Sequence, residues 1–403
     1  FLFLYFLVNT MTLPLDHNEH MYVTAGYLMR SMEIYRDFAF VQTPYLPILY
    51  DGLFRILRAD HLLLVGRLTS LFFTMASCAL LWLIVFRRTK SYAVSHISVM
   101  IFGCSYFIQD ISGEAANYMM PMAAILLAAL YYQHILEKPE LRLPKMYCLG
   151  LILAVATGAK LYYSALFLPF LICTSMFPRQ ESFSQKFIGQ TAPLVIGFVV
   201  GLIPMIHYVA HYAWSVWFNN VKYHILNLHW RGFNLGPNIE YRFSSLLDIL
   251  LTHPSNLAFV VIFALILVKS FAASGYFKKN RLSDDPIAML SAMSIVVGVF
   301  IGITPLPMFV YYFAAGFPFA VIFGCCLIER PLLLNWSVGE KSIAAVCIML
   351  IIGSSSFVIY ERLGAFRSMD SWTPFQVHQI AKNIKAELGS QSSNGNIATL
   401  SPL

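Results

Sequence analysis

The sequence predicts an all-α, polytopic membrane protein, and composition, apolar run length and the placement of positive charge each favour this class. Of the 403 residues, 58% are hydrophobic and 12% are charged, and the mean hydropathy is +0.67. A water-soluble domain of this size carries about twice that charged fraction. Because so little polar surface is available, much of the chain has to face lipid, where helices satisfy their own backbone groups.

Apolar stretches recur along the chain at lengths suited to a bilayer, which requires about 20 residues per helix. We predict about eleven spans, at 1–9 (the end of a helix whose start is missing), 62–86, 93–108, 115–136, 146–159, 161–177, 191–213, 255–271, 287–303, 308–328 and 342–360. The stretch 146–177 is too long for one crossing and short for two. A hairpin of short helices that turns near 158–160 is therefore predicted there.

Positive charge gives the predicted topology. Lys and Arg gather in short clusters in every second loop between the predicted spans, whereas the intervening turns 109–114 and 304–307 contain neither. By the positive-inside rule, the clusters are cytoplasmic, and this pattern explains the net charge of +7 better than a nucleic-acid groove does. The loops 10–61 and 214–254 and the tail from residue 362 then lie on the outer side.

Two parts of the chain are predicted: a membrane domain over 1–361, whose outer loop 10–61 carries the acidic site, and an outer tail over 362–403. The tail has a helical pattern over 374–388 and the start of a strand over 397–400. We expect it to be the truncated beginning of an external domain. The seven cysteines lie in apolar stretches without a C-x-x-C pair, which favours buried thiols over disulfides or zinc.

The outer loop 10–61 holds the candidate catalytic acids. Asp16 and Glu19 follow the first span directly, and amphipathic helices over 21–32 and 45–57 are predicted to lie on the membrane surface. Poor access to water raises a carboxylate's pKa and makes it a usable base near neutral pH. The structural alternative is that these acids only cap a surface helix. His17 and His20 flank Glu19 without a third strong ligand nearby, so no metal site is predicted.

The same region resembles the GT-C superfamily of membrane glycosyltransferases, in the branch of protein O-mannosyltransferases and lipid A aminoarabinose transferases. The resemblance covers about residues 14–90, and hydropathy agrees over most of the chain. The matching segments, in order, are Glu19 and Tyr22, Tyr35-Arg36-Asp37-Phe38, Thr43-Pro44-Tyr45-Leu46-Pro47, and Arg67-Leu68-Thr69-Ser70. Where the family pattern has Asp-Glu, this chain has Asn18-Glu19. Either Asp16 or Glu19 is then the base, or the chain is an inactive relative.

Further site residues are predicted, Glu114 or Asn117 from the same resemblance, Lys160 from its apolar setting as well as the resemblance, and Arg231 from the residues of its loop. Glu114 or Asn117 matches an acidic residue that the family has at the start of the same helix, and it would help Glu19 by orienting the acceptor, unless the turn is simply solvated. Lys160 would meet the carrier phosphate; the alternative is snorkelling to the interface. Arg231, in a basic and aromatic loop, suits the same phosphate or ordinary anionic lipid. Tyr22 completes the predicted substrate-binding set.

The resemblance implies a metal-independent, inverting transferase without a cofactor, which moves a monosaccharide from a polyprenyl-phosphate carrier to an unidentified acceptor. It would lie in a prokaryotic inner membrane with its site facing outward; the endoplasmic reticulum is the alternative. A transporter or flippase of a lipid-linked substrate is the competing interpretation. That class predicts internal repeats and charges at the bilayer midplane, whereas the sequence shows no repeat and its acids cluster in the first outer loop.

Overall fold

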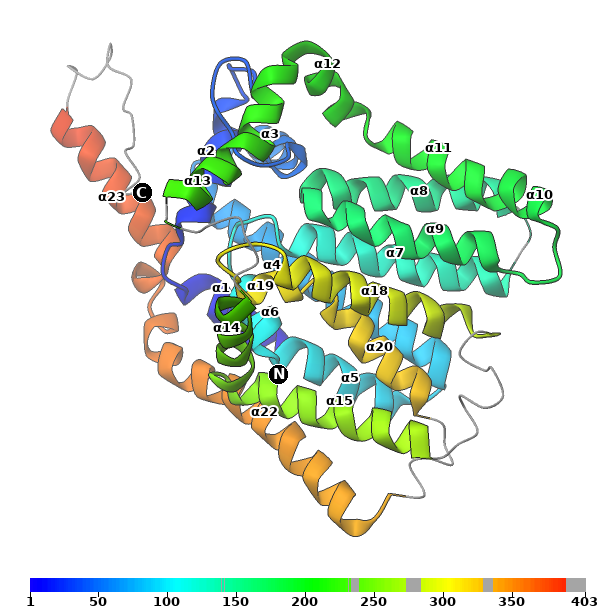
Figure 1. Ribbon diagram of the computed structural model, residues 1–403. Helices are drawn as coiled ribbons and strands as arrows, with labels where there is room; N and C mark the ends of the chain where they lie inside the picture. Colours follow the sequence, from blue (N-terminus) through cyan, green and yellow to red (C-terminus); the bar gives the residue numbers. More distant parts are fainter. Residues whose placement is uncertain are drawn as a thin grey trace.

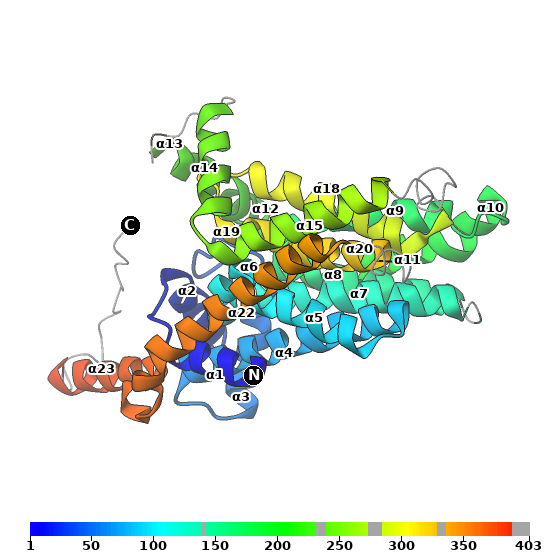
Figure 2. The ribbon, with the colours of Figure 1, turned by 90° about the horizontal axis from the view of Figure 1, so that it is seen from below.

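A computed structural model describes residues 1–138, 140, 142–230, 232, 239–272, 284–328 and 336–388. Within these ranges the fold is helical throughout, with one isolated bridge between Ile34 and Phe38 and no β-strand (Figure 1). The long helices run side by side. Helices α2, α3, α13, α14 and α23 lie at one end of this bundle and α10 lies at the other (Figures 1 and 2). The predicted all-α class is confirmed.

The helices of the first half are α1 (Leu2–Thr12), α2 (His17–Leu28), α3 (Tyr45–Ile56), α4 (Leu62–Thr89), α5 (Tyr92–Cys104), α6 (Tyr106–Ser112), α7 (Met119–Glu137), α8 (Arg142–Ala159), a 3-10 helix η1 (Leu161–Leu166), α9 (Phe167–Met176) and α10 (Phe183–Lys186). Those of the second half are α11 (Ala192–Gly201), α12 (Ile203–Trp217), α13 (Tyr223–Trp230), α14 (Ile239–Leu251), α15 (Pro254–Ala272), α18 (Pro286–Ile303), α19 (Val310–Phe313), α20 (Phe317–Leu327), α22 (Val338–Phe366) and α23 (Thr373–Leu388).

Four of the described helices, α4, α7, α18 and α22, are long and apolar enough to cross a membrane alone. Three further spans are bent pairs: α5 with α6 at 61°, the α10–α11 segment with the α12–α13 segment at 55°, and α14 with α15 at 95°. Counting each pair once gives up to seven spans. The protein is therefore an integral membrane protein, but the predicted count of about eleven is not confirmed.

The bends have local causes that hydropathy does not register. The predicted span 93–108 breaks at Ser105, whose backbone is extended. The predicted span 191–213 breaks at Leu202, two residues before Pro204, which removes a backbone donor and crowds the preceding turn. The predicted span 308–328 becomes the shorter α20, which begins at Phe317 with Pro318 near its start. At 158–160 the chain turns as predicted, since α8 ends at Ala159 and α9 runs back toward α10 (Figure 1).

Helices α8 and α11 approach each other through glycine. A Cβ added to Gly197 would lie 2.0 Å from the Tyr147 carbonyl oxygen, and one added to Gly150 would lie 2.2 Å from the Leu194 carbonyl oxygen. Small residues let helix backbones come close in a membrane, where dispersion contacts replace the hydrophobic effect as the cause of association. This contact joins α11 to α8, the helix that precedes the turn after Ala159.

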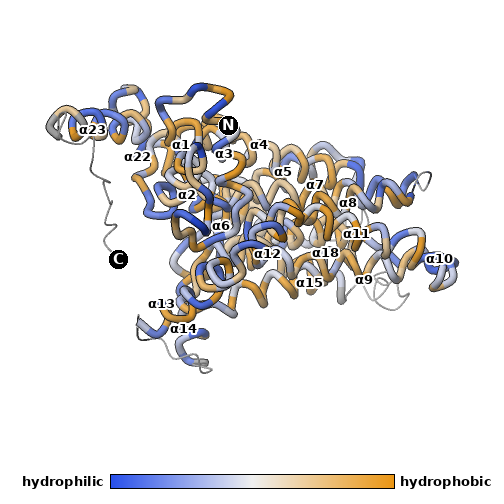
Figure 3. The backbone as a smooth tube through the Cα atoms, turned by 90° about the horizontal axis from the view of Figure 1, so that it is seen from above, coloured by the Kyte–Doolittle hydropathy of each residue, from blue (hydrophilic) through white to orange (hydrophobic). Residues whose placement is uncertain are grey.

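Of the helices predicted for the first loop, α3 matches 45–57 and is amphipathic, whereas α2 begins four residues before the predicted 21–32, ends at Leu28 and has no distinct apolar face. The predicted tail helix is present as α23. The Thr373 hydroxyl donates to the Leu13 carbonyl at 2.7 Å, so α23 begins beside the end of α1. Residues 397–400 lie outside the described ranges. Figure 3 shows hydrophobic colour along the parallel helices and more hydrophilic colour at both ends, near α2 and α23 and near α10. This distribution fits a bundle whose apolar middle lies in the bilayer and whose two ends lie at the two membrane surfaces.

A candidate active site at one end of the bundle

Asp16 is the N-cap of α2. Its Oδ1 accepts a hydrogen bond from the Asn18 backbone N–H at 2.7 Å, and the Asp16 N–H donates to Glu19 Oε2 at 3.1 Å, which completes a capping box. The Asp16 side chain is 36% exposed, and His17 Nδ1 lies 3.4 Å from Oδ1. Among the described residues no hydrogen bond reaches Asp16 Oδ2. The cap therefore fixes the carboxylate in place and leaves one oxygen available.

Glu19 has a different environment, although it lies one helical turn away. Arg67 Nε donates to Glu19 Oε1 at 2.9 Å and Arg67 Nη2 donates to Oε2 at 2.7 Å, and both side chains are fully buried. The Ala115 N–H also donates to Oε1, at 2.7 Å. Such bidentate, charge-assisted bonds are strong and fix orientation. Glu19 would have to break this set of bonds in order to accept a proton.

The other donors of Arg67 fasten the chain that enters the site. Nη1 donates to the carbonyls of Thr10 and Leu13 at 2.8 and 2.9 Å, and Nη2 donates to the Pro14 carbonyl at 3.3 Å. Through Arg67 and Glu19, the helices α1, α2 and α4 and the turn before α7 meet at one point. This ion pair joins the segments that meet at this end of the bundle.

Lys160 lies between α8 and η1, and only 6% of it is exposed. Its ammonium lies 3.5 Å from the ring centre of Tyr118, 5.2 Å from that of Tyr162 and 5.4 Å from that of Tyr311. Three aromatic faces thus stabilise the cation. Within the described ranges no carboxylate lies within ion-pair distance of Lys160, whereas at the other end of the bundle Lys269 pairs with Glu340 at 2.7 Å and Arg179 with Asp284 at 2.8 Å.

Polar contacts connect the lysine to the acidic loop. Asn117 Nδ2 donates to the Ala159 carbonyl at 3.0 Å and so fixes the residue before Lys160. Asn18 Nδ2 donates to the Tyr118 hydroxyl at 3.3 Å. The residue at which the chain departs from the family pattern therefore contacts the aromatic cage. Tyr22 is buried with its ring edge-on to Phe40, at a centroid distance of 5.6 Å.

Glu114 belongs to the turn between α6 and α7. Its Oε2 is buried and has no hydrogen-bond partner in the described part of the chain. Burial, together with the nearby charges of Asp16, Asp110 and Glu19, raises the pKa of Glu114 to about 9, although Lys160 acts in the opposite direction. Ionisation of this carboxyl is therefore disfavoured.

The structure thus brings Asp16, Glu19, Glu114 and Lys160 to one end of the bundle, and Asn117 and Tyr22 support them. Arg231 lies outside the described residues. Sequence reasoning missed Arg67 as the partner of Glu19 and missed the cage function of Tyr118 and Tyr162. A signal for Arg67 was available, because an arginine within an apolar span requires a buried partner.

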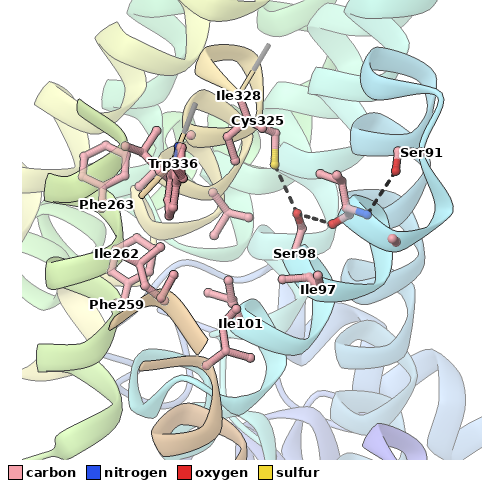
Figure 4. A pocket seen from close by; sticks show the side chains of 18 residues that line it. Ser91, Ile97, Ser98, Ile101, Phe259, Ile262, Phe263, Cys325, Ile328 and Trp336 are labelled. Atoms are coloured by element: carbon pink, nitrogen blue, oxygen red, sulfur yellow. Dashed lines mark hydrogen bonds between the residues drawn. The ribbon is translucent and has the colours of Figure 1, made fainter. Parts of the chain in front are cut away.

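An apolar cavity of about 410 Å³ lies away from these residues, between α5, α15, α20 and α22 (Figure 4). The labelled Phe259, Ile262 and Phe263 line one side of it. The Ser98 hydroxyl, which is among its few polar groups, is satisfied by the Val94 carbonyl at 2.7 Å and lies 3.1 Å from Cys325 Sγ. The cavity contains none of the predicted site residues and offers no charged group for chemistry.

Neither a protein-family model nor a curated protein sequence matches the chain. Among solved structures, the crystal structure of ArnT from Cupriavidus metallidurans bound to undecaprenyl phosphate is similar, with a TM-score of 0.59 and 10% sequence identity. The similarity covers 93% of this chain and 73% of that one. At this level of identity the likeness shows the fold, so the GT-C fold predicted from the sequence is confirmed.

Proposed function

We propose that the protein is a membrane glycosyltransferase that transfers a monosaccharide from a polyprenyl-phosphate carrier to an acceptor on the outer side. The observation that carries this proposal is the buried Lys160 ammonium, which lies in an aromatic cage beside carboxyl groups and has no ion-pair partner among the described residues. A buried cation needs an anion. A solved structure of the same fold binds undecaprenyl phosphate, which supports a phosphate on a lipid carrier as that anion.

Asp16 is the proposed general base, because Glu19 is occupied by Arg67 and by two backbone N–H groups. The acceptor O–H or N–H gives its proton to the Asp16 carboxylate while its lone pair attacks the anomeric carbon. The bond from that carbon to the phosphate oxygen breaks, and its electron pair leaves with the carrier phosphate beside Lys160. Attack opposite the leaving phosphate inverts the configuration of the sugar carbon.

The remaining predicted residues have supporting functions in this proposal. Glu19 holds α2, and with it the Asp16 cap, in place. Asn117 and Tyr22 shape the site, and Arg231 supplies a second contact to the phosphate. The proposed location is a prokaryotic inner membrane, with Asp16 and Lys160 facing the periplasm. This orientation rests on the cytoplasmic placement of the positive clusters.

The test is to incubate the purified protein in lipid with a panel of polyprenyl-phosphate sugars and to follow donor consumption by mass spectrometry. Asp16→Asn should lower consumption by about 10²–10⁴-fold, as expected on removal of a general base, and Lys160→Met should abolish saturable donor binding. Asp51→Asn is the matched control, because Asp51 is an acid of the same outer loop whose ion-pair partner among the described residues is Arg55 on α3.

Each alternative predicts a different result. If Glu19→Gln abolishes turnover without loss of folding and Asp16→Asn does not, Glu19 is the base. Tight, saturable binding of an intact donor across the panel would overturn the transferase proposal in favour of a transporter or an inactive relative. Absence of binding would show that the GT-C fold here serves another ligand.

A further inference from the structure

Glu114 lies in a buried position close to other acidic residues, where an ionised carboxylate is unfavourable. Its buried Oε2 lacks a hydrogen-bond partner, as described above, and the charges that act on it come from Asp16 and Glu19 on α2, Asp110 on α6, and Lys160. The nearby phenols of Tyr118 and Tyr311 also interact with it. Arg67 is paired with Glu19, and among the described residues Lys160 is a cation that acts on Glu114.

A buried oxygen without a partner costs free energy in the empty protein. In native proteins such an atom requires an explanation, such as a catalytic role or a bound ion or water. The caged ammonium of Lys160 is a second, independent indication, since it is more than nine-tenths buried. Among the described residues, Glu114 Oε2 thus lacks a hydrogen-bond partner and Lys160 lacks an ion-pair partner, and the charges of the two groups act on each other.

We propose that Glu114 is a neutral carboxylic acid whose O–H donates a hydrogen bond to a non-esterified phosphate oxygen of the lipid carrier, next to Lys160. This proposal rests on the proposed function. The phosphodiester of a sugar donor carries one negative charge, and an ionised Glu114 would repel it. The protonated group supplies a hydrogen-bond donor and carries no negative charge that would repel the phosphate. An apolar setting can hold a carboxylic acid neutral for this purpose, as in the oxyanion hole of ketosteroid isomerase.

This assignment changes the function expected for Glu114. A carboxylate at this position would orient an acceptor or accept a proton, and an amide could not replace it. A carboxylic acid that donates one hydrogen bond is imitated well by the amide of glutamine, which is neutral, of similar shape and carries N–H donors. Glutamine and alanine substitutions therefore distinguish the two states.

The experiment measures the affinity for undecaprenyl phosphate, without a sugar, of the full chain in nanodiscs between pH 6 and pH 10. At pH 7, Glu114→Gln should bind within about threefold of the wild type, and Glu114→Ala should lose about tenfold, as for one lost hydrogen bond to a charged group. Above about pH 9 the wild type should weaken as Glu114 ionises, by more than Glu114→Gln does over the same range. A loss in Glu114→Gln as large as in Glu114→Ala would overturn the proposal.

Infrared spectroscopy gives a second measurement that needs no ligand. The wild type at pH 7 should show the C=O stretch of a protonated carboxylic acid that is missing in Glu114→Gln, and absence of this band would overturn the proposal. A wild type that shows the band without binding the carrier would overturn the contact to phosphate and the proposed function together. Carrier binding without sugar consumption would contradict only the proposed function.

Discussion

The pair of Glu19 and Arg67 shows how one buried contact can decide what a motif residue does. Both side chains are fully buried and doubly hydrogen-bonded to each other, and Arg67 also satisfies three backbone carbonyls. Removing one partner of such a pair leaves an uncompensated buried charge, which costs more than replacing both. The importance of each residue could be predicted from the sequence. Their pairing across 48 residues could not, because it depends on how α2 packs against α4.

We expect Arg67→Leu to lower the free energy of unfolding by about 3–5 kcal/mol, since it leaves the Glu19 carboxylate buried without a counter-charge. The double variant Glu19→Gln, Arg67→Leu should be more stable than Arg67→Leu alone. Thermal unfolding in one detergent, arranged as a double-mutant cycle, measures the coupling between the two residues. Additive effects would contradict a direct interaction.

At the scale of the element, the close approach of α8 and α11 depends on Gly197. We predict that Gly197→Ala destabilises the protein by about 1–3 kcal/mol, the usual cost of overpacking, because the new Cβ would lie 2.0 Å from the rigid Tyr147 carbonyl. Gly353→Ala on α22 is the matched control, since a Cβ there meets nothing within 4 Å. The measurement is thermal unfolding of both variants, and equal melting temperatures would contradict the close contact.

The contact of α23 with the bundle is expected to weaken in acid. The His61 and His378 rings lie 3.9 Å apart, and Phe375 packs against His61 at 5.1 Å. Burial, then His61 and Lys382, lower the pKa of His378, and Asp60 opposes them. Because the docked state lowers the pKa of His378, the contribution of this histidine to docking is fully present at a pH above its ordinary pKa of about 6.5. It is lost as the pH falls through the pKa of the docked state.

Hydrogen exchange over 373–388, corrected for its intrinsic pH dependence, measures this docking between pH 5 and pH 8. Protection should decrease toward pH 5 in the wild type and should change much less in His378→Gln, which cannot become charged. Protection that is constant with pH, or that decreases equally in both proteins, would show that the histidine contact does not control docking. Asp370 lines the same surface pocket as His61 and His378, so Asp370→Asn tests whether this second titrating group affects docking.

For the whole molecule, the sequence predicted the class, two helices in the first loop, the tail helix and the turn at 158–160, because each has a local signature. The bends at Ser105 and Leu202 were missed, since a hydropathy window averages over a single extended residue or a proline. The candidate site was predicted in part. Asp16 and Lys160 stand out as ionisable groups beside apolar sequence, whereas the cage of Tyr118, Tyr162 and Tyr311 brings together three separate segments.

The proposed orientation of the whole bundle rests on the positive-inside rule and is open to a direct test. Ser31, in the first loop, and Ser184, on α10, are both exposed and belong to opposite ends of the bundle. In a Cys148→Ser background, which removes the one exposed native thiol among the described residues, intact cells carrying Ser31→Cys should be labelled by a membrane-impermeant maleimide. Cells carrying Ser184→Cys should be labelled only after permeabilisation, because α10 lies beside the positive residues Arg179 and Lys186. The reverse pattern would place Asp16 and Lys160 on the cytoplasmic side, where the proposed donor and acceptor would have to be sought instead.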